Sequence, residues 1–132
     1  MANIAQYGSK ALLDWVCLGA TPSRPATLGV GISLGAPTSI SGSEVGTASG
    51  YTAQTVTFGA AGTPSGSATV TNANAMTFGP FSTAQSLSGL VVKDTLATAG
   101  NLLFYGTLTM ARTVAAGDSL VIAAAALTIT LS

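Results

Sequence analysis

The segment GISLG, Gly31 to Gly35, has the residue types and spacing of the G-x-S-x-G pattern, in which a serine attacks a carbonyl carbon. Such a serine needs a general base to take its proton, normally a histidine, and an acid that orients the base. The chain contains no histidine. The flanks also favour a strand and a proline-bearing loop over the strand-to-helix turn that the pattern requires. We therefore expect Ser33 to be an ordinary strand residue.

The other chemically active residue types are sparse and scattered. The overlapping stretch GVGISLG is close to a dinucleotide-binding loop, but Leu34 replaces the third glycine and no helix is expected to follow. The sequence does not exclude that two of the four acids form a glycosidase-type pair of carboxylates. Positions in loops and turns are the simpler expectation for these acids. With no histidine, one cysteine and no clustered acids, a metal site is not expected. We predict no catalytic residue, no metal ligand, no cofactor and no enzymatic activity. The acids are Asp14, Glu44, Asp94 and Asp118.

The composition indicates a protein that packs against other proteins. Charged residues make up 6% of the chain, against roughly 25% in ordinary domains. Alanine, glycine, serine and threonine account for 72 of 132 residues, and the net charge is zero. Little charge repulsion therefore keeps copies apart. The four basic residues are scattered, which argues against nucleic-acid binding. The length suits a single domain over residues 1–132.

The single cysteine, Cys17, excludes a disulfide within the chain. Its apolar neighbours predict a small buried hydrophobic residue there, not a reactive thiol. The first residues lack a basic region followed by an unbroken apolar run and a small-residue cleavage site. We therefore expect a protein that is made and used without export.

A helix is expected over residues 4–18, because apolar residues recur there at helical spacing and no proline interrupts them. Ser9 is a candidate cap for its second half, and the prolines of TPSRP end it. This helical segment (1–20) precedes a β body (26–132). Trp15 is expected to seal the core of that body, the alternative being an anchor on a neighbouring protein.

The β body shows period-2 alternation bounded by turn residues. Over 26–37, branched and large apolar residues alternate with small ones, which predicts a strand whose glycine face another segment approaches closely. Further strands are expected at 51–61, 67–71, 75–78, 84–94 and 101–110. The fold class is therefore all-β: an antiparallel β-sandwich or jelly roll with a short N-terminal helix.

The chain ends with AAGDSLVIAAAALTITLS, residues 115–132. Its apolar run, Leu120 to Leu127, is far shorter than the ~20 residues of a membrane helix. The alternation of LTITL favours a strand. We predict strands at 119–124 and 126–131, joined by a tight connection or bulge in the alanines, and no membrane contact.

Three stretches have a distinctive texture: ALLDWVCLGATPSRPATLGVGISLGAPT (11–38), GSEVGTASGYTAQTVTFGAA (42–61) and the closing NLLFYGTLTMARTVAAGDSLVIAAAALTITLS (101–132). Together they resemble a family of small tailed-phage virion proteins, often named phage tail fibre proteins. The resemblance covers nearly the whole chain. One departure is Ala125 or Ala126, where relatives tend to carry glycine, so that a bulge there is less easily accommodated.

In size and expected topology the chain is also similar to jelly-roll capsid cement (decoration) proteins. The resemblance implies a structural virion protein, assembled in the host bacterial cytoplasm, that self-associates as a dimer or trimer and stabilises the major capsid protein shell. The alternative is a tail fibre or baseplate protein, with possible host-receptor or glycan binding. The loop 38–50 with Glu44 is the expected partner contact, and Lys93 and Arg112 are further candidates.

Overall fold

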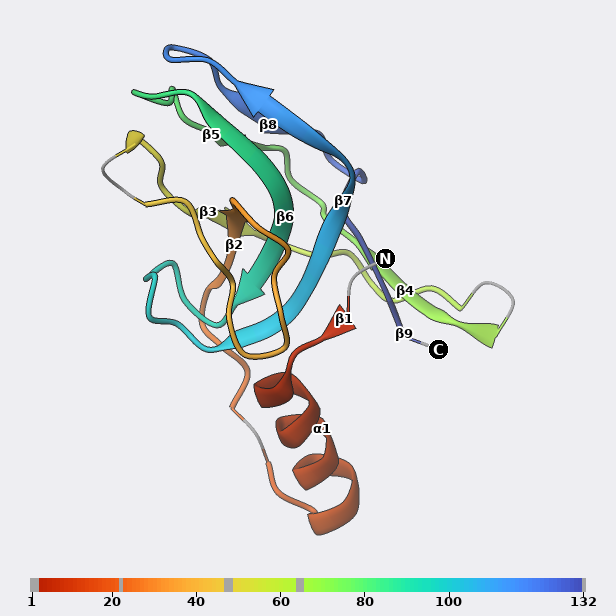
Figure 1. The fold of residues 1–132 in the computed structure, drawn as a ribbon. Coiled ribbons are helices and arrows are strands. Elements are labelled where there is room, and N and C mark those ends of the chain that lie inside the picture. Colours follow the sequence, from red (N-terminus) through yellow and green to blue (C-terminus); the bar gives the residue numbers. More distant parts are fainter. Residues whose placement is uncertain (1–2, 22, 47–48, 64–65, 132) are drawn as a thin grey trace.

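The computed structural model describes residues 3–21, 23–46, 49–63 and 66–131. Short strands dominate this part of the chain, and one helix stands near its beginning (Figure 1). In chain order the elements are β1 (Asn3–Ile4), α1 (Gln6–Leu18), β2 (Leu28–Ser33), β3 (Gln54–Val56), β4 (Ala68–Thr71), β5 (Met76–Phe78), β6 (Gln85–Lys93), β7 (Leu102–Val114), β8 (Leu120–Ile122) and β9 (Thr128–Leu131).

All strand pairs are antiparallel. One layer is a five-stranded sheet in the order β1-β7-β6-β2-β3. Facing it are two separate pairs, β4 with β9 and β5 with β8. The core lies between the layers, since it draws buried side chains from β2, β3 and β6 on one side and from β5 and β9 on the other. The predicted all-β antiparallel sandwich with a short N-terminal helix is confirmed.

Strand β2 is buried on both faces, whereas the alternation in sequence predicts one apolar face. Val30 and Ile32 point into the core. On the opposite face, a Cβ added to Gly31 would lie 2.2 Å from Glu44 Oε1, and one on Gly29 would lie 2.6 Å from the Thr95 carbonyl oxygen. The predicted close approach to the glycine face is therefore confirmed. The strand is shorter than 26–37, because the chain turns after Ser33.

The predicted strand over 51–61 is also too long, since β3 covers only Gln54–Val56. Tyr51 precedes the strand and lies in the core, where its ring stacks on those of Phe78 and Phe81 with centroid distances of 6.0 and 6.5 Å. Tyr51 and Phe81 are therefore structural aromatics of the core. In the other direction β7 extends four residues beyond the predicted strand, to Val114.

The C-terminal stretch forms two strands joined by a turn through the alanines, as predicted. Ala125 adopts a left-handed conformation with φ of 64°. The buried Asn72 holds this turn: its side chain donates to the Ala123 carbonyl at 2.9 Å and accepts from the Leu127 amide at 2.8 Å. Strands β8 and β9 pair with β5 and β4 and not with each other.

Helix α1 leaves the body after its first turns (Figure 1). It begins after Ala5, whose amide donates to the Leu103 carbonyl of β7, and it ends at Gly19 in the left-handed region. Ser9 lies inside the helix, so the predicted cap is wrong. Trp15 is 55% exposed and Cys17 is exposed, so the predictions of a core tryptophan and a buried cysteine are both wrong. The reason is that the second half of the helix extends past the sheet it starts from.

Within the described ranges, no helix has the length and apolar character needed to cross a bilayer.

Candidate functional site

The most polar interior feature is an ion pair between Glu44 and Lys93. Lys93 ends β6, and Glu44 comes from the loop that follows β2 and crosses its glycine face. The Lys93 amine lies 2.5 Å from Glu44 Oε2, and the two side chains are 2% and 7% exposed. The same amine donates to the Ala97 carbonyl at 2.8 Å. The pair therefore fastens two loops to the central strands.

Tyr51 completes this network from the core side. Its hydroxyl donates to Glu44 Oε1 at 2.8 Å and accepts from the Ile32 amide at 2.9 Å. Burial raises the pKa of the Tyr51 phenol above its ordinary value of 10, and the hydrogen bond to the Glu44 carboxylate adds to the rise. The phenol is therefore a fixed donor at neutral pH, and both oxygens of Glu44 are occupied inside the protein.

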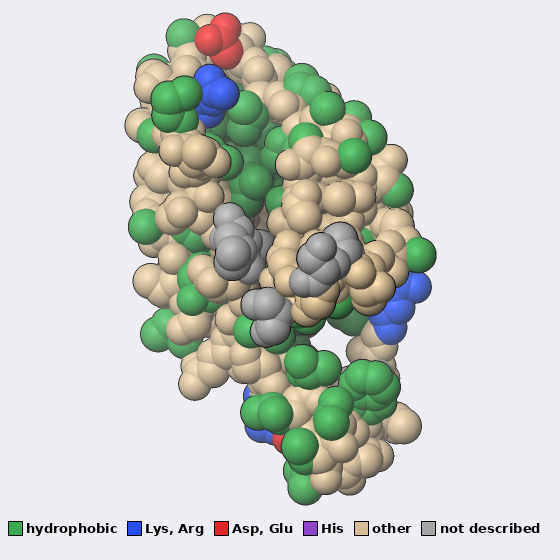
Figure 2. All heavy atoms as spheres, turned by 90° about the vertical axis from the view of Figure 1, so that its right-hand side faces the viewer, with side chains coloured by type: hydrophobic (Ala, Val, Ile, Leu, Met, Phe, Trp, Pro, Cys, Tyr) green, Lys and Arg blue, Asp and Glu red, His purple; other side chains and the backbone are tan. Residues whose placement is uncertain are grey.

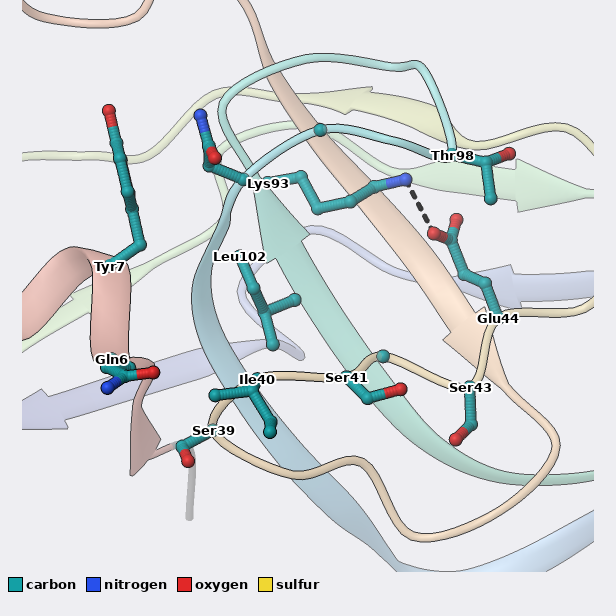
Figure 3. A pocket seen from close by; sticks show the side chains of 13 residues that line it. Gln6, Tyr7, Ser39, Ile40, Ser41, Ser43, Glu44, Lys93, Thr98 and Leu102 are labelled. Atoms are coloured by element: carbon teal, nitrogen blue, oxygen red, sulfur yellow. Dashed lines mark hydrogen bonds and ion pairs between the residues drawn. The ribbon is translucent and has the colours of Figure 1, made fainter.

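A pocket of about 520 Å³ opens beside the ion pair (Figure 3). The first turn of α1 forms one wall, the loop over residues 39–44 another, and the segment 98–102 a third. Its lining is rich in hydroxyl and amide groups, with Ile40 and Leu102 as apolar members. Such a lining can hydrogen-bond a neutral polar molecule.

The two charged groups that line the pocket are paired with each other. Its carboxylate and its amine neutralise each other, and general acid–base work needs a group free to exchange a proton with the substrate. Ser33 is buried and donates its hydroxyl to the Gly42 carbonyl, so it serves as a strand-end residue, in agreement with the prediction from its flanks. In the described part of the chain, no three His, Cys, Asp or Glu side chains gather as a metal-binding group would.

The predicted contact residues lie in different environments. Glu44 and Lys93 are brought together in the interior, where they are not accessible as a surface contact, and we assign them a structural role. Arg112 lies on the exposed part of β7, so a contact through Arg112 stays a prediction. The remaining acids have local partners: Asp14 pairs with Lys10, Asp94 accepts two hydrogen bonds from Asn101, and Asp118 accepts one from the Ala115 amide.

The apolar face of α1 is a surface feature that the sequence suggested only as the alternative to a core position for Trp15. Trp15 is 55% and Leu18 78% exposed, and none of the helix residues is buried. Figure 2 shows hydrophobic side chains gathered on the helix below the β body. The signal was present in the sequence as an amphipathic pattern, but that pattern is the same whether its partner is the helix's own domain or a second chain.

A second apolar surface lies along one open side of the sandwich. β1 pairs with β7 only at Phe104 and Tyr105, so the edge beyond them has no strand neighbour among the described residues. Two adjoining hollows, of about 350 and 830 Å³, run between this edge and the β8–β9 region. They share the apolar side chains of Leu90, Leu108 and Leu127. Figure 2 shows such a hollow lined by hydrophobic side chains.

A comparison with models of protein families places the chain in a family. The family model described as podophage GP4 fiber I protein gp80 matches residues 3–130, and therefore spans the helix and all the strands but the last residue of β9. No curated protein matches the chain.

Proposed function

The chain belongs to the family of the podophage GP4 fiber I protein gp80, a family of phage virion fibre proteins, and we propose that it is a fibre subunit that works by assembly and not by catalysis. It contacts copies of itself and neighbouring virion proteins through apolar surfaces. Assembly takes place in the host bacterial cytoplasm, where virion subunits are made.

The observation that carries this proposal is how the side chains divide between interior and surface. Six of the eight charged residues make hydrogen bonds or ion pairs within the chain. Large apolar side chains, in contrast, are exposed on α1, and others line the open side of the sandwich. Extended apolar patches of this kind mark protein contacts more often than free surface. The molecule therefore offers packing surfaces to a partner and few ionic groups.

A second candidate is a capsid cement protein that binds the major capsid protein and stabilises the shell as a dimer or trimer. The feature that favours it is the single β-sandwich body without sequence repeats, since a long fibre shaft is usually repetitive. Many copies that each bind a symmetric shell weakly gain avidity, so that no single contact has to be strong. Fibre and cement proteins use the same kind of apolar surface, so the two candidates differ in location and number.

Copy number per particle separates the candidates. Purified virions are analysed by quantitative mass spectrometry against isotope-labelled peptides of this chain, with the major capsid protein as the internal standard. A fibre subunit is expected at a small multiple of three or six copies per particle. A cement protein is expected at a copy number comparable with that of the shell protein.

Absence of the chain from particles purified through two density gradients would refute both candidates. Particles treated with a nonionic detergent serve as the control, because a contaminant that adheres to the particle surface is lost there while an assembled subunit is retained.

A further inference from the structure

Helix α1 carries a continuous row of small and apolar residues that extends beyond the body of the protein. The row is spaced at i, i+3, i+4, i+7 and i+10, which places its members along one side of a helix. Its first part lies against β7, and its last part reaches past the sheet (Figure 1). We call this the α1 row: Gly8, Ala11, Leu12, Trp15 and Leu18.

A narrow apolar cleft of about 240 Å³ lies beside the α1 row. Leu103 and Phe104 of β7 form its floor with Leu131 of β9, and Leu12 and Trp15 form its helical wall. All the lining side chains are apolar, so water in the cleft finds few hydrogen-bonding groups. A large apolar side chain from another molecule would displace that water favourably.

No ionised side chain interrupts the row. Lys10 and Asp14 pair with each other four residues apart, at positions outside the row. The exposed parts of the row with the flanking Tyr7 and Val16 present roughly 500 Å² of apolar surface, against the ~800 Å² per partner of a stable interface. The floor of the cleft adds to this area.

We propose that the α1 row is a self-association surface, on which α1 of a second copy of this chain packs so that its large side chains enter the cleft. This inference rests on the proposed assembly function and names its first partner. A two-fold symmetric dimer pairs one patch with the same patch on its neighbour, and an uncharged apolar row is complementary to itself. Because the net charge of the chain is zero, there is little electrostatic repulsion between two copies.

A lipid surface fits the same row less well. Helices that lie on membranes usually carry several lysines or arginines on their polar face, which anionic headgroups attract. Helix α1 carries one lysine, Lys10, and its charge is matched by Asp14. The charge on the helix therefore favours a protein partner.

The test uses the sole tryptophan of the chain. Trp15 lies in the α1 row, so its emission reports burial of the proposed interface without added labels. The purified full chain is diluted from ~100 μM to below 1 μM, the range of a moderate self-affinity. Mass is followed by light scattering and emission by fluorescence. A dimer is expected at the high end, with emission that shifts to longer wavelength as it dissociates.

The matched variants are Leu18→Glu, in the row, and Leu13→Glu, an exposed leucine of the same helix outside the row. Neither leucine is buried, so both variants are expected to fold, which circular dichroism verifies. Leu18→Glu is expected to weaken association at least tenfold, whereas Leu13→Glu leaves it within about twofold. The longer-wavelength emission should persist in Leu18→Glu at concentrations where the wild type is blue-shifted.

Three results would overturn the proposal: a monomeric wild type at ~100 μM, an unchanged oligomer in Leu18→Glu, or equal weakening by both variants. Co-sedimentation of a monomeric wild type with phosphatidylcholine–phosphatidylglycerol vesicles would assign the row to a lipid surface instead. The mass in solution is independent of the copy number in virions, so failure of this proposal and failure of the proposed function are distinguishable.

Discussion

Glu44 and Lys93 lie 49 positions apart in the sequence, yet their charged atoms are 2.5 Å apart in a nearly closed environment. The pair joins the loop after β2 to the end of β6, and Tyr51 ties the same carboxylate to the core. An apolar sandwich with few charges has thus placed one full ion pair inside. A buried charge is costly when it loses its partner. We therefore expect the free energy of unfolding to depend strongly on substitutions in this pair.

Replacing Lys93 with methionine should therefore destabilise the protein strongly. Methionine keeps much of the side-chain volume but leaves Glu44 without its counter-charge, and an unpaired buried charge costs about 3–5 kcal/mol. Urea unfolding followed by circular dichroism measures the change. Lys10→Met is the matched control, because Lys10 pairs with Asp14 at the surface, where such a pair contributes about 0.5 kcal/mol or less.

Adding Glu44→Gln to Lys93→Met should recover part of the lost stability. No charge is then left unpaired, and the amide oxygen of the new glutamine still accepts the hydrogen bond from Tyr51. A double variant as unstable as the sum of the single ones would contradict the coupling inferred from the geometry.

Gly31 and Gly35, the two glycines of GISLG, should respond differently to the same substitution. A Cβ on Gly31 would fall 2.2 Å from Glu44 Oε1, so Gly31→Ala must displace the ion pair and should cost about 1–3 kcal/mol. A Cβ on Gly35 meets nothing within 4 Å, and Gly35→Ala should stay within about 0.5 kcal/mol. Thermal unfolding of the two variants measures this difference in stability. Equal melting temperatures would argue against the close packing of Glu44 on β2.

Tyr51 should make the protein sensitive to alkaline pH. Its pKa is raised in the folded state, so the unfolded chain releases the proton near pH 10 while the folded chain keeps it. The stabilisation is therefore complete below pH 10 and is lost as the pH rises above it. In Tyr51→Phe the decline in unfolding free energy above pH 10 should be shallower by up to about 1.4 kcal/mol per pH unit.

Urea unfolding of wild type and Tyr51→Phe at several pH values from 8 to 11.5 measures both slopes under the same conditions. Parallel slopes above pH 10 would show that the Tyr51 proton is not held by folding.

Ala125→Gly should stabilise the protein. Ala125 has a φ of 64°, a region that costs an L-residue with a side chain about 1–2 kcal/mol and glycine little. Part of that gain is offset by the greater freedom of glycine in the unfolded chain, which leaves about 0.5–1 kcal/mol. Ala124→Gly, one residue earlier and outside the left-handed region, should destabilise by a similar amount. A lower melting temperature for Ala125→Gly than for the wild type would contradict the turn geometry.

Several features of the fold could be predicted because their signals are local. Alternation over Leu28 to Ile32 and over Leu127 to Leu131 indicated strands, and the alanine run between two such patterns indicated a tight connection. The prolines after Gly19 marked the end of the helix. The absence of histidine from the sequence was enough to weaken the nucleophile hypothesis for Ser33.

The candidate site was less predictable, because it depends on contacts between distant segments. Glu44 sits in a serine- and glycine-rich loop, which in sequence resembles an exposed contact loop. In the structure that loop folds back over β2, because the glycine face leaves room for a side chain and Lys93 supplies the opposite charge. Similarly, Trp15 lies in an amphipathic helix, and no local pattern states whether that helix ends on its own sheet or extends beyond it.

The sequence by itself therefore determined the strand-rich body, the single N-terminal helix and the scarcity of groups for catalysis, since periodicity, turn residues and composition are properties of short segments. Only the tertiary structure decided which faces are covered. Strand order and loop path bring Glu44 to Lys93 and leave the last part of the α1 row exposed, because burial depends on what long-range packing places against each surface.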